Sequence, residues 1–232
     1  MGKINPMPPI SFQHSFLSTW GARWNINNKF NKKQAMDFGK EIDSIVGKTL
    51  AIFLGNTPPC LGSLKSLNPP NDDCVEIGPS RIIGGIRPQN FDVVYRPDGL
   101  RIAFDSKTLN DKKSVQKNWQ NMINDLATEA STVHSRFPYA IVAFIVIIPR
   151  PALMQAQEDQ IIRTLDRLAS RKEISDEEHL AEAISLVVWD PSAGQLVNNT
   201  PSSYSKLHIN KFNKIIEYCY KKRYKGLPPH DK

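Results

Sequence analysis

The sequence has little of what a membrane, secreted or zinc-binding protein needs. Only three of the 232 residues are cysteine, and no Cys-x-x-Cys pair occurs. We therefore expect neither a zinc site nor a disulfide framework, and we expect a reducing compartment, the cytoplasm. The longest apolar run, 139–148, is far below the roughly 20 residues that cross a membrane. The N-terminus lacks the basic-then-apolar pattern of a secretion signal.

Several catalytic patterns are also missing. The five histidines are dispersed without metal-ligand spacing, and neither a phosphate-binding Gly-x-x-x-x-Gly-Lys loop nor a Gly-x-Ser-x-Gly elbow occurs. Charge is plentiful: 30 basic residues against 23 acidic ones give a net charge of +7. This balance favours a polyanionic partner, although it also suits a mildly basic protein without one.

The length and the 40% hydrophobic content predict one globular domain. We divide it into an N-terminal arm (1–31), a core (33–190) and a basic C-terminal helix (204–225). Apolar periodicity and turn residues predict the following elements: helices at 15–24, 32–54, 114–133, 153–172, 175–183 and 204–224; strands within 74–86, in the hairpin 90–107, and at 139–148 and 184–189. The fold class expected from this order is α/β, with a central mixed sheet flanked by helices.

The most informative stretch is Asn90 to Lys107, which reads as two strands joined by a tight turn at Pro97-Asp98-Gly99. In the second strand, Leu100, Ile102 and Phe104 fall on one face, whereas Asp105 and Lys107 fall on the other. A carboxylate and an amine therefore point the same way from the end of a strand.

The position of Asp92 depends on the length of the turn. A loop of two or four residues sets Asp92 opposite Ala103 and diagonal to Asp105, close enough for two carboxylates to share a cation. A three-residue loop with a bulge would turn Asp92 to the apolar face, unless a second bulge corrected the register.

This arrangement resembles the PD-(D/E)xK nuclease superfamily, above all its type II restriction endonucleases. The first Asp of that pattern falls on Asp92, its second acid on Asp105 and its lysine on Lys107, while Phe91 stands where the family has proline. The order of predicted elements over 33–190 is similar to the α-β-β-β-α-β core of the superfamily. The resemblance thus implies a restriction-endonuclease-like core.

The resemblance also implies a site and an activity. Asp92, Asp105 and the backbone carbonyl of Ser106 would hold Mg²⁺, and Lys107 would orient or deprotonate the attacking water or stabilise the phosphate. Glu41, on the first core helix, would join through water, with Asp37 and Asp43 as competitors on that helix, or would simply be a solvated surface residue.

The implied protein is a homodimeric restriction enzyme that hydrolyses double-stranded DNA in the cytoplasm of a prokaryotic cell. Two other readings fit the residues: a structure-specific repair or junction-resolving nuclease, and a non-catalytic DNA-binding protein. DNA contacts are expected from the polar side of the helix at 114–133 and its start, unless this is only a solvated face: Lys112, Lys113, Gln116, Lys117, Gln120 and Asn121. The basic segments 23–33 and 206–225 are further candidates.

Overall fold

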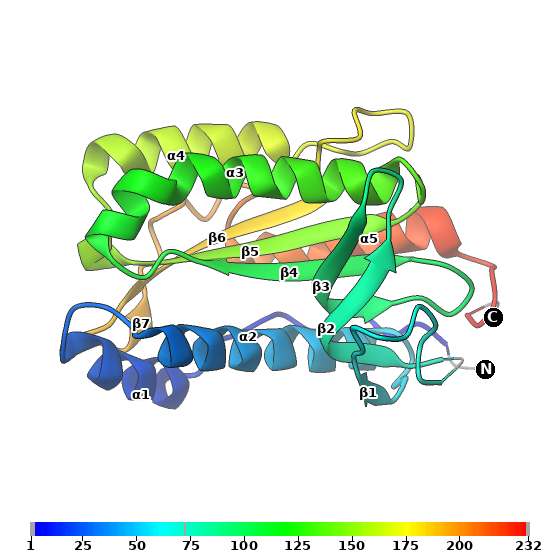
Figure 1. Ribbon diagram of the computed structural model, residues 1–232, viewed down its shortest axis with the longest axis horizontal. Helices are drawn as coiled ribbons and strands as arrows, with labels where there is room; N and C mark the ends of the chain where they lie inside the picture. The colour runs from blue at the N-terminus through cyan, green and yellow to red at the C-terminus, as the bar shows by residue number, and fades with distance from the viewer. Residues whose placement is uncertain (1–2, 72, 231–232) are drawn as a thin grey trace.

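The fold is a mixed β-sheet between two layers of helices (Figure 1). A computed structural model describes residues 3–71 and 73–230, so the ends of the predicted single domain, 1–2 and 231–232, lie outside the described residues. The helices are α1 (His14–Asn25), α2 (Lys32–Phe53), α3 (Lys112–His134), the short 3₁₀ helix η1 (Arg150–Ala152), α4 (Gln155–Leu168) and α5 (Ile209–Tyr224). The strands are β1 (Pro59–Leu61), β2 (Val75–Ile83), β3 (Pro88–Tyr95), β4 (Ile102–Thr108), β5 (Ile141–Pro149), β6 (Ala183–Asp190) and β7 (Gln195–Leu196).

The seven strands lie in the sheet in chain order, from β1 to β7. The pairs β1/β2, β4/β5 and β5/β6 are parallel, and the pairs β2/β3, β3/β4 and β6/β7 are antiparallel. Helix α3 connects β4 to β5 and helix α4 connects β5 to β6, because a parallel pair needs a long crossover. The predicted mixed α/β fold is confirmed at this level.

Strand β5 explains why its sequence is apolar without alternation. Every residue of the strand is buried. Ile141, Ala143, Ile145 and Ile147 enter the core on one side of the sheet, whereas Val142, Phe144, Val146 and Ile148 enter the core on the other side. A central strand covered on both faces has this pattern.

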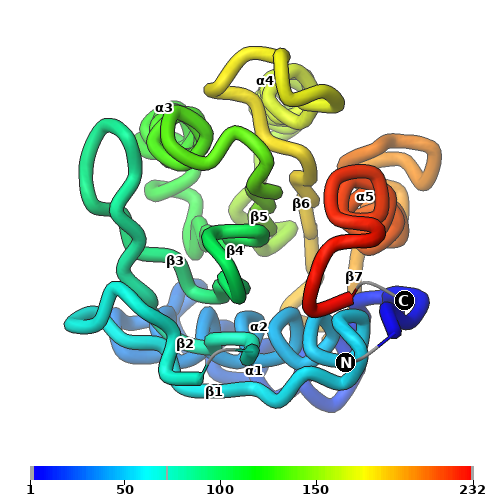
Figure 2. Tube along the Cα trace, turned by 90° about the vertical axis from the view of Figure 1, so that its right-hand side faces the viewer, coloured from blue at the N-terminus to red at the C-terminus, as the bar shows by residue number. Residues whose placement is uncertain are grey.

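The two helical layers differ in composition. Helices α3 and α4 cover one face of the sheet, and α2 and α5 cover the other, with α1 packed against α2 (Figures 1 and 2). The core beneath the second layer is rich in aromatic side chains. The ring centroid of Phe38 in α2 lies 5.4 Å from that of Trp20 in α1 and 5.6 Å from that of Trp189 in β6. None of the helices among the described residues is long and apolar enough to cross a membrane.

The helix predicted at 175–183 is wrong. This segment consists of turns and ends in β6, which begins at Ala183. The Asp176 carboxylate accepts hydrogen bonds from the backbone N–H groups of Lys172 and Glu173, at 2.8 and 2.9 Å. The carboxylate therefore closes a turn behind it instead of starting a helix ahead of it.

The expectation of no disulfide is also wrong. Cys60 and Cys74 are bonded, with their Cα atoms 5.9 Å apart, and Cys219 is a buried free thiol. The segment 55–73, for which the sequence predicts no helix or strand, contains β1, which lies parallel to β2 and brings the two cysteines together. This is a long-range pairing that cysteine spacing does not reveal.

Candidate active site

The candidate site lies where β3 and β4 separate. Residues Val93–Tyr95 pair with Ile102–Phe104, and beyond them β3 continues along β2 alone. The connection spans 96–101, which is longer than the predicted tight turn, and Leu100 packs into the opposite core from Ile102 because β4 begins only at Ile102. Continuing this register by one residue sets Asp92 opposite Asp105, not opposite Ala103. The two carboxylates are thus direct neighbours across the strands, closer than the predicted diagonal.

Beyond the last β3–β4 pair, side chains form hydrogen bonds with the residues of β4 that β3 no longer pairs. The N–H group of Ser106 donates to Oδ2 of Asp92 at 3.4 Å, at a position where a regular ladder would supply a strand carbonyl. The hydroxyl of Ser106 donates to Oδ1 of Asp43 at 2.7 Å. Asp43 comes from the middle of α2, so three elements contribute to one group of acids.

Lys107 lies on the α3 side of β4. Its Nζ donates to Asp105, two residues earlier on the same face of the strand, and to Oε1 of Glu129 at 2.9 Å. Gln89 of β3 also donates to Oε1 of Glu129, at 3.1 Å. The strand alternation predicted the Asp105–Lys107 contact, whereas the contributions of α3 and Gln89 were not predicted.

Burial and mutual repulsion shape the protonation of this group. The pKa of Asp92 is raised to about 10, first by burial, then by a hydrogen bond to Asp105 and by repulsion from Asp105 and Asp43. Burial and the charge of Asp105 also raise the pKa values of Asp43 and Glu129, each to about 7, against the opposing contacts of Ser106 and Lys107. Like charges that share a buried site retain protons in this way.

Lys107 responds in the opposite sense. Burial alone would lower the pKa of its ammonium group, but the charges of Asp105 and Glu129 more than reverse that effect and raise it above the usual value for lysine. Lys107 is therefore held as a cation beside the two carboxylates.

The group contains hard oxygen donors whose mutual repulsion a bound cation would relieve. Within residues 3–71 and 73–230, no three His, Cys, Asp or Glu side chains form a ready-made metal cage. The predicted metal ligands Asp92 and Asp105 are only two side chains and so do not make such a cage. In addition, Oε2 of the buried Glu129 has no hydrogen-bond partner. Two neighbouring carboxylates beside a free backbone segment fit a Mg²⁺ ion that keeps several of its waters.

Glu41 does not join the group. Its side chain is exposed and accepts a hydrogen bond from Nε1 of Trp20 at 3.2 Å, and the half-exposed Asp37 pairs with Lys33. The face of α2 that meets the site carries Gly39, Asp43 and Gly47 at four-residue intervals. The competitor Asp43, and not Glu41, is therefore the acid on this helix that reaches the fork.

The six predicted DNA contacts all lie on the exposed side of the first half of α3: Lys112, Lys113, Gln116, Lys117, Gln120 and Asn121. Gln116 also reaches Sδ of Met154 at 3.1 Å. The carboxylate of Asp111 already accepts from the N–H groups of Lys113 and Ser114, so these two groups at the helix start are occupied.

Glu129 was missed from the sequence, although it leaves a signal there. It occupies a position three residues after Leu126 and four before Val133, inside the apolar stripe that predicted α3. A carboxylate at a buried stripe position needs a cationic or hydrogen-bonding partner. That requirement could have connected α3 with Lys107.

No family model matches the chain, and no match is found among curated proteins or among solved structures.

Proposed function

We propose that this protein is a Mg²⁺-dependent endonuclease that hydrolyses double-stranded DNA at a specific sequence, as type II restriction enzymes of the PD-(D/E)xK superfamily do. The observation that carries the proposal is the meeting of Asp92, Asp105 and Lys107 at the β3–β4 fork. The proposed fold is accordingly the restriction-endonuclease-like core.

The residues at the fork suit phosphodiester hydrolysis. Asp92, Asp105 and the backbone carbonyl of Ser106 would hold the metal, which when bound supplies charge neutralisation at the phosphate and an acidified water. Asp43, through Ser106, fixes the backbone segment between the acid and the lysine. The segment is thus positioned from the α2 side independently of the metal.

Lys107 has the charge that a phosphate requires. Its raised pKa and its contacts with Asp105 and Glu129 keep the amine protonated. This supports a role in stabilising negative charge on the phosphate rather than one as general base. Glu129 holds the ammonium group from the α3 side and acts as a positioning residue.

Duplex DNA as the substrate follows from the resemblance and from the exposed polar side of α3. Lys112, Lys113 and Lys117 would neutralise phosphates, and Gln116, Gln120 and Asn121 can donate to and accept from DNA. We further propose a homodimer, because a two-fold protein matches a palindromic site. Location in the cytoplasm of a prokaryotic cell is proposed from the resemblance alone, because the Cys60–Cys74 bond removes the cysteine argument for a reducing compartment.

Cleavage of phage DNA in the presence of Mg²⁺ tests the function. We expect discrete fragments, and we expect Asp105→Asn and Lys107→Ala each to slow cutting at least ~100-fold, the scale of losing a charge-stabilising group. Asp37→Asn is the matched control, since it removes a half-exposed carboxylate on α2 that pairs with Lys33 away from the fork, and it should cut like the wild type. Wild-type cutting by Asp105→Asn would remove this site from consideration, and cutting confined to branched DNA would favour the junction-resolving alternative.

A further inference from the structure

A cavity of about 600 Å³ lies beside α5, and its lining contains none of the fork carboxylates. One wall is formed by α5 with Lys211, Lys214 and Tyr218, a second by the chain around Lys172, and the rim by the segment of Tyr204 and Lys206. Helix α5 lies along the β6 side of the sheet, whereas the fork lies between β3 and β4 (Figure 2). The cavity is therefore a second place at which this basic chain can meet a ligand.

The lysines of this cavity differ from the other basic residues of α5. Lys221 pairs with Glu217, Lys222 with Glu173, and Arg223 with Glu182, so the conspicuous basic run of the sequence is already neutralised. In the part of the chain that the structure describes, Lys172, Lys211 and Lys214 make no ion pair with a carboxylate, and Lys206 approaches Asp166 only at 3.6 Å. Within α5, the positive charge without an ion-pair partner therefore lies at the cavity.

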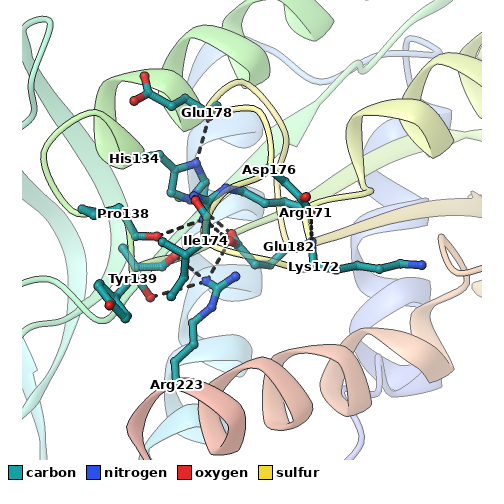
Figure 3. Close-up of polar contacts among 12 residues, drawn as sticks. His134, Pro138, Tyr139, Arg171, Lys172, Ile174, Asp176, Glu178, Glu182 and Arg223 are labelled. Atoms are coloured by element: carbon teal, nitrogen blue, oxygen red, sulfur yellow. Dashed lines mark hydrogen bonds and ion pairs between the residues drawn. The ribbon is translucent and has the colours of Figure 1, made fainter.

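A buried polar network keeps one wall in place (Figure 3). Glu182 accepts hydrogen bonds from Arg171 and Arg223, both at 2.8 Å, and Arg171 also donates to the carbonyl of Ile174 at 2.8 Å. Lys172, the next residue, extends away from the Glu182 carboxylate. The wall is thus rigid at Arg171, while the ammonium group of Lys172 remains available to a ligand.

Two aromatic side chains accompany the lysines. Tyr204 is 92% exposed and Tyr218 is 61% exposed, which is unusual for rings of this size in a folded chain. Lys211, Lys214 and Tyr218 follow one another at intervals of three and four residues on one face of α5. This stripe is on the order of 10 Å long, from seven residues at 1.5 Å each, and thus longer than a single phosphate group.

We propose that this cavity binds single-stranded nucleic acid. The lysines contact successive phosphates, and Tyr204 and Tyr218 stack on unpaired bases, the combination by which single strands are held without sequence preference. A duplex keeps its bases stacked inside the helix and offers nothing to these rings. The site does not require the fork or a metal ion, and it goes beyond the proposed nuclease activity.

Fluorescence anisotropy with a labelled oligothymidylate, the full chain and EDTA tests the proposal. We expect Lys211→Ala/Lys214→Ala to weaken binding at least tenfold and to lower the slope of log affinity against log salt by about 1.4, since each phosphate contact on a single strand contributes about 0.7. Tyr204→Ala/Tyr218→Ala should weaken binding at least ~30-fold, the combined scale of losing two stacked bases, with the salt slope unchanged.

The controls separate this site from diffuse charge and from the fork. Lys48→Ala/Lys65→Ala removes two exposed lysines elsewhere and should bind as the wild type does, and so should Asp105→Asn, whether or not the wild type cleaves DNA. Circular dichroism confirms that each variant is folded. Equal losses for the two lysine pairs, no loss for the tyrosine pair, or equal competition by duplex or polyglutamate would each overturn the proposal.

Discussion

At the scale of single residues, Asp92 shows how a carboxylate buried beside other acids affects the stability of the folded protein. Its pKa is raised to about 10 because it is buried beside Asp105 and Asp43. A carboxyl whose pKa is higher in the folded chain than in the unfolded chain binds extra protons when folded. Stability therefore falls as the pH rises from the ordinary value near 4.

We predict that Asp92→Asn stabilises the metal-free protein at pH 8. The amide fills the same space without the charge, so we expect the melting temperature to rise by ~5 °C, corresponding to about 2 kcal/mol in a chain of this size. Thermal denaturation from pH 5 to pH 9 measures this, and the gain over the wild type should grow with pH. Asp159→Asn, an exposed change, is the control, and a gain that is constant with pH would contradict the assignment.

The proposed metal site at Asp92 leads to a prediction of how Mg²⁺ changes the melting temperature. If Asp92 and Asp105 hold Mg²⁺, the ion binds the folded chain and relieves their repulsion, so Mg²⁺ should raise the melting temperature of the wild type. The rise should be several degrees at a concentration well above the dissociation constant and should be lost in Asp92→Asn. Thermal denaturation with and without MgCl₂ measures it, and equal rises in both proteins would place the ion elsewhere.

At the scale of elements, α2 is fitted to the sheet through its glycines. A Cβ at Gly47 would lie 2.5 Å from Cγ1 of Ile77, whereas one at Gly39 would lie 3.7 Å from Oγ of Ser106, an ordinary contact. The helix approaches β2 closely at Gly47, one turn after Asp43. The distance between α2 and the sheet at this point sets whether Asp43 reaches Ser106.

This difference predicts opposite outcomes for two glycine substitutions on one helix. Gly39→Ala should stabilise the protein by about 0.5–1 kcal/mol, since alanine suits a helix interior better than glycine. Gly47→Val should destabilise it by roughly 2 kcal/mol by overpacking against Ile77. Urea denaturation measures both. Similar effects of the two changes would mean that the contact at Gly47 does not limit the position of the helix.

The comparison of sequence and structure is clearest at this scale. Helices α2, α3 and α5 and strand β5 were predictable because their apolar periodicity follows directly from burial on one or two faces. The helix predicted at 175–183 is absent because the Asp176 side chain accepts a hydrogen bond from the backbone of the turn before it and does not cap a helix after it. The strands β1 and β7 carry no periodicity, since each has only two or three residues.

The site was predictable in part for the same reason. Strand alternation placed Asp105 and Lys107 together, because it depends only on neighbouring residues. Asp43 and Glu129 reach the site from two helices, and their arrival depends on how α2 and α3 are rotated about their axes. That rotation is set by tertiary packing at glycines and apolar residues, which a single sequence does not define.

At the scale of the whole molecule, one buried carboxylate joins distant parts of the chain. Glu182 precedes β6 and accepts hydrogen bonds from Arg171 after α4, Arg223 of α5 and the N–H group of Val142 in β5 (Figure 3). His134, at the end of α3, places Nε2 3.3 Å from the same carboxylate. Helix α3 of one layer and helix α5 of the other are thus tied to the start of the central strands by a single side chain.

The environment of Glu182 leads us to expect that the folded protein loses stability in acid. Burial acts to raise its pKa, but the nearby His134, Arg223 and the N–H of Val142 overcome that effect and lower the pKa to about 2. Because the folded value lies below the unfolded one, the stabilisation is complete above pH 4.5 and is lost as the pH falls toward 2. A difference of this size corresponds to about 3 kcal/mol.

We therefore predict that Glu182→Gln destabilises the protein by about 3–5 kcal/mol at neutral pH, because it leaves Arg171 and Arg223 buried without a carboxylate. The difference from the wild type should shrink between pH 4.5 and pH 2.5, where the wild-type carboxylate itself begins to take up a proton. Urea denaturation at pH 7, 4.5 and 2.5 measures both effects, with the exposed Glu177→Gln as control. If the two substitutions behaved alike, Glu182 would not be what holds these helices to the sheet, and apolar packing would be. The Glu182 network would then not be what keeps the wall of the cavity beside α5 in place.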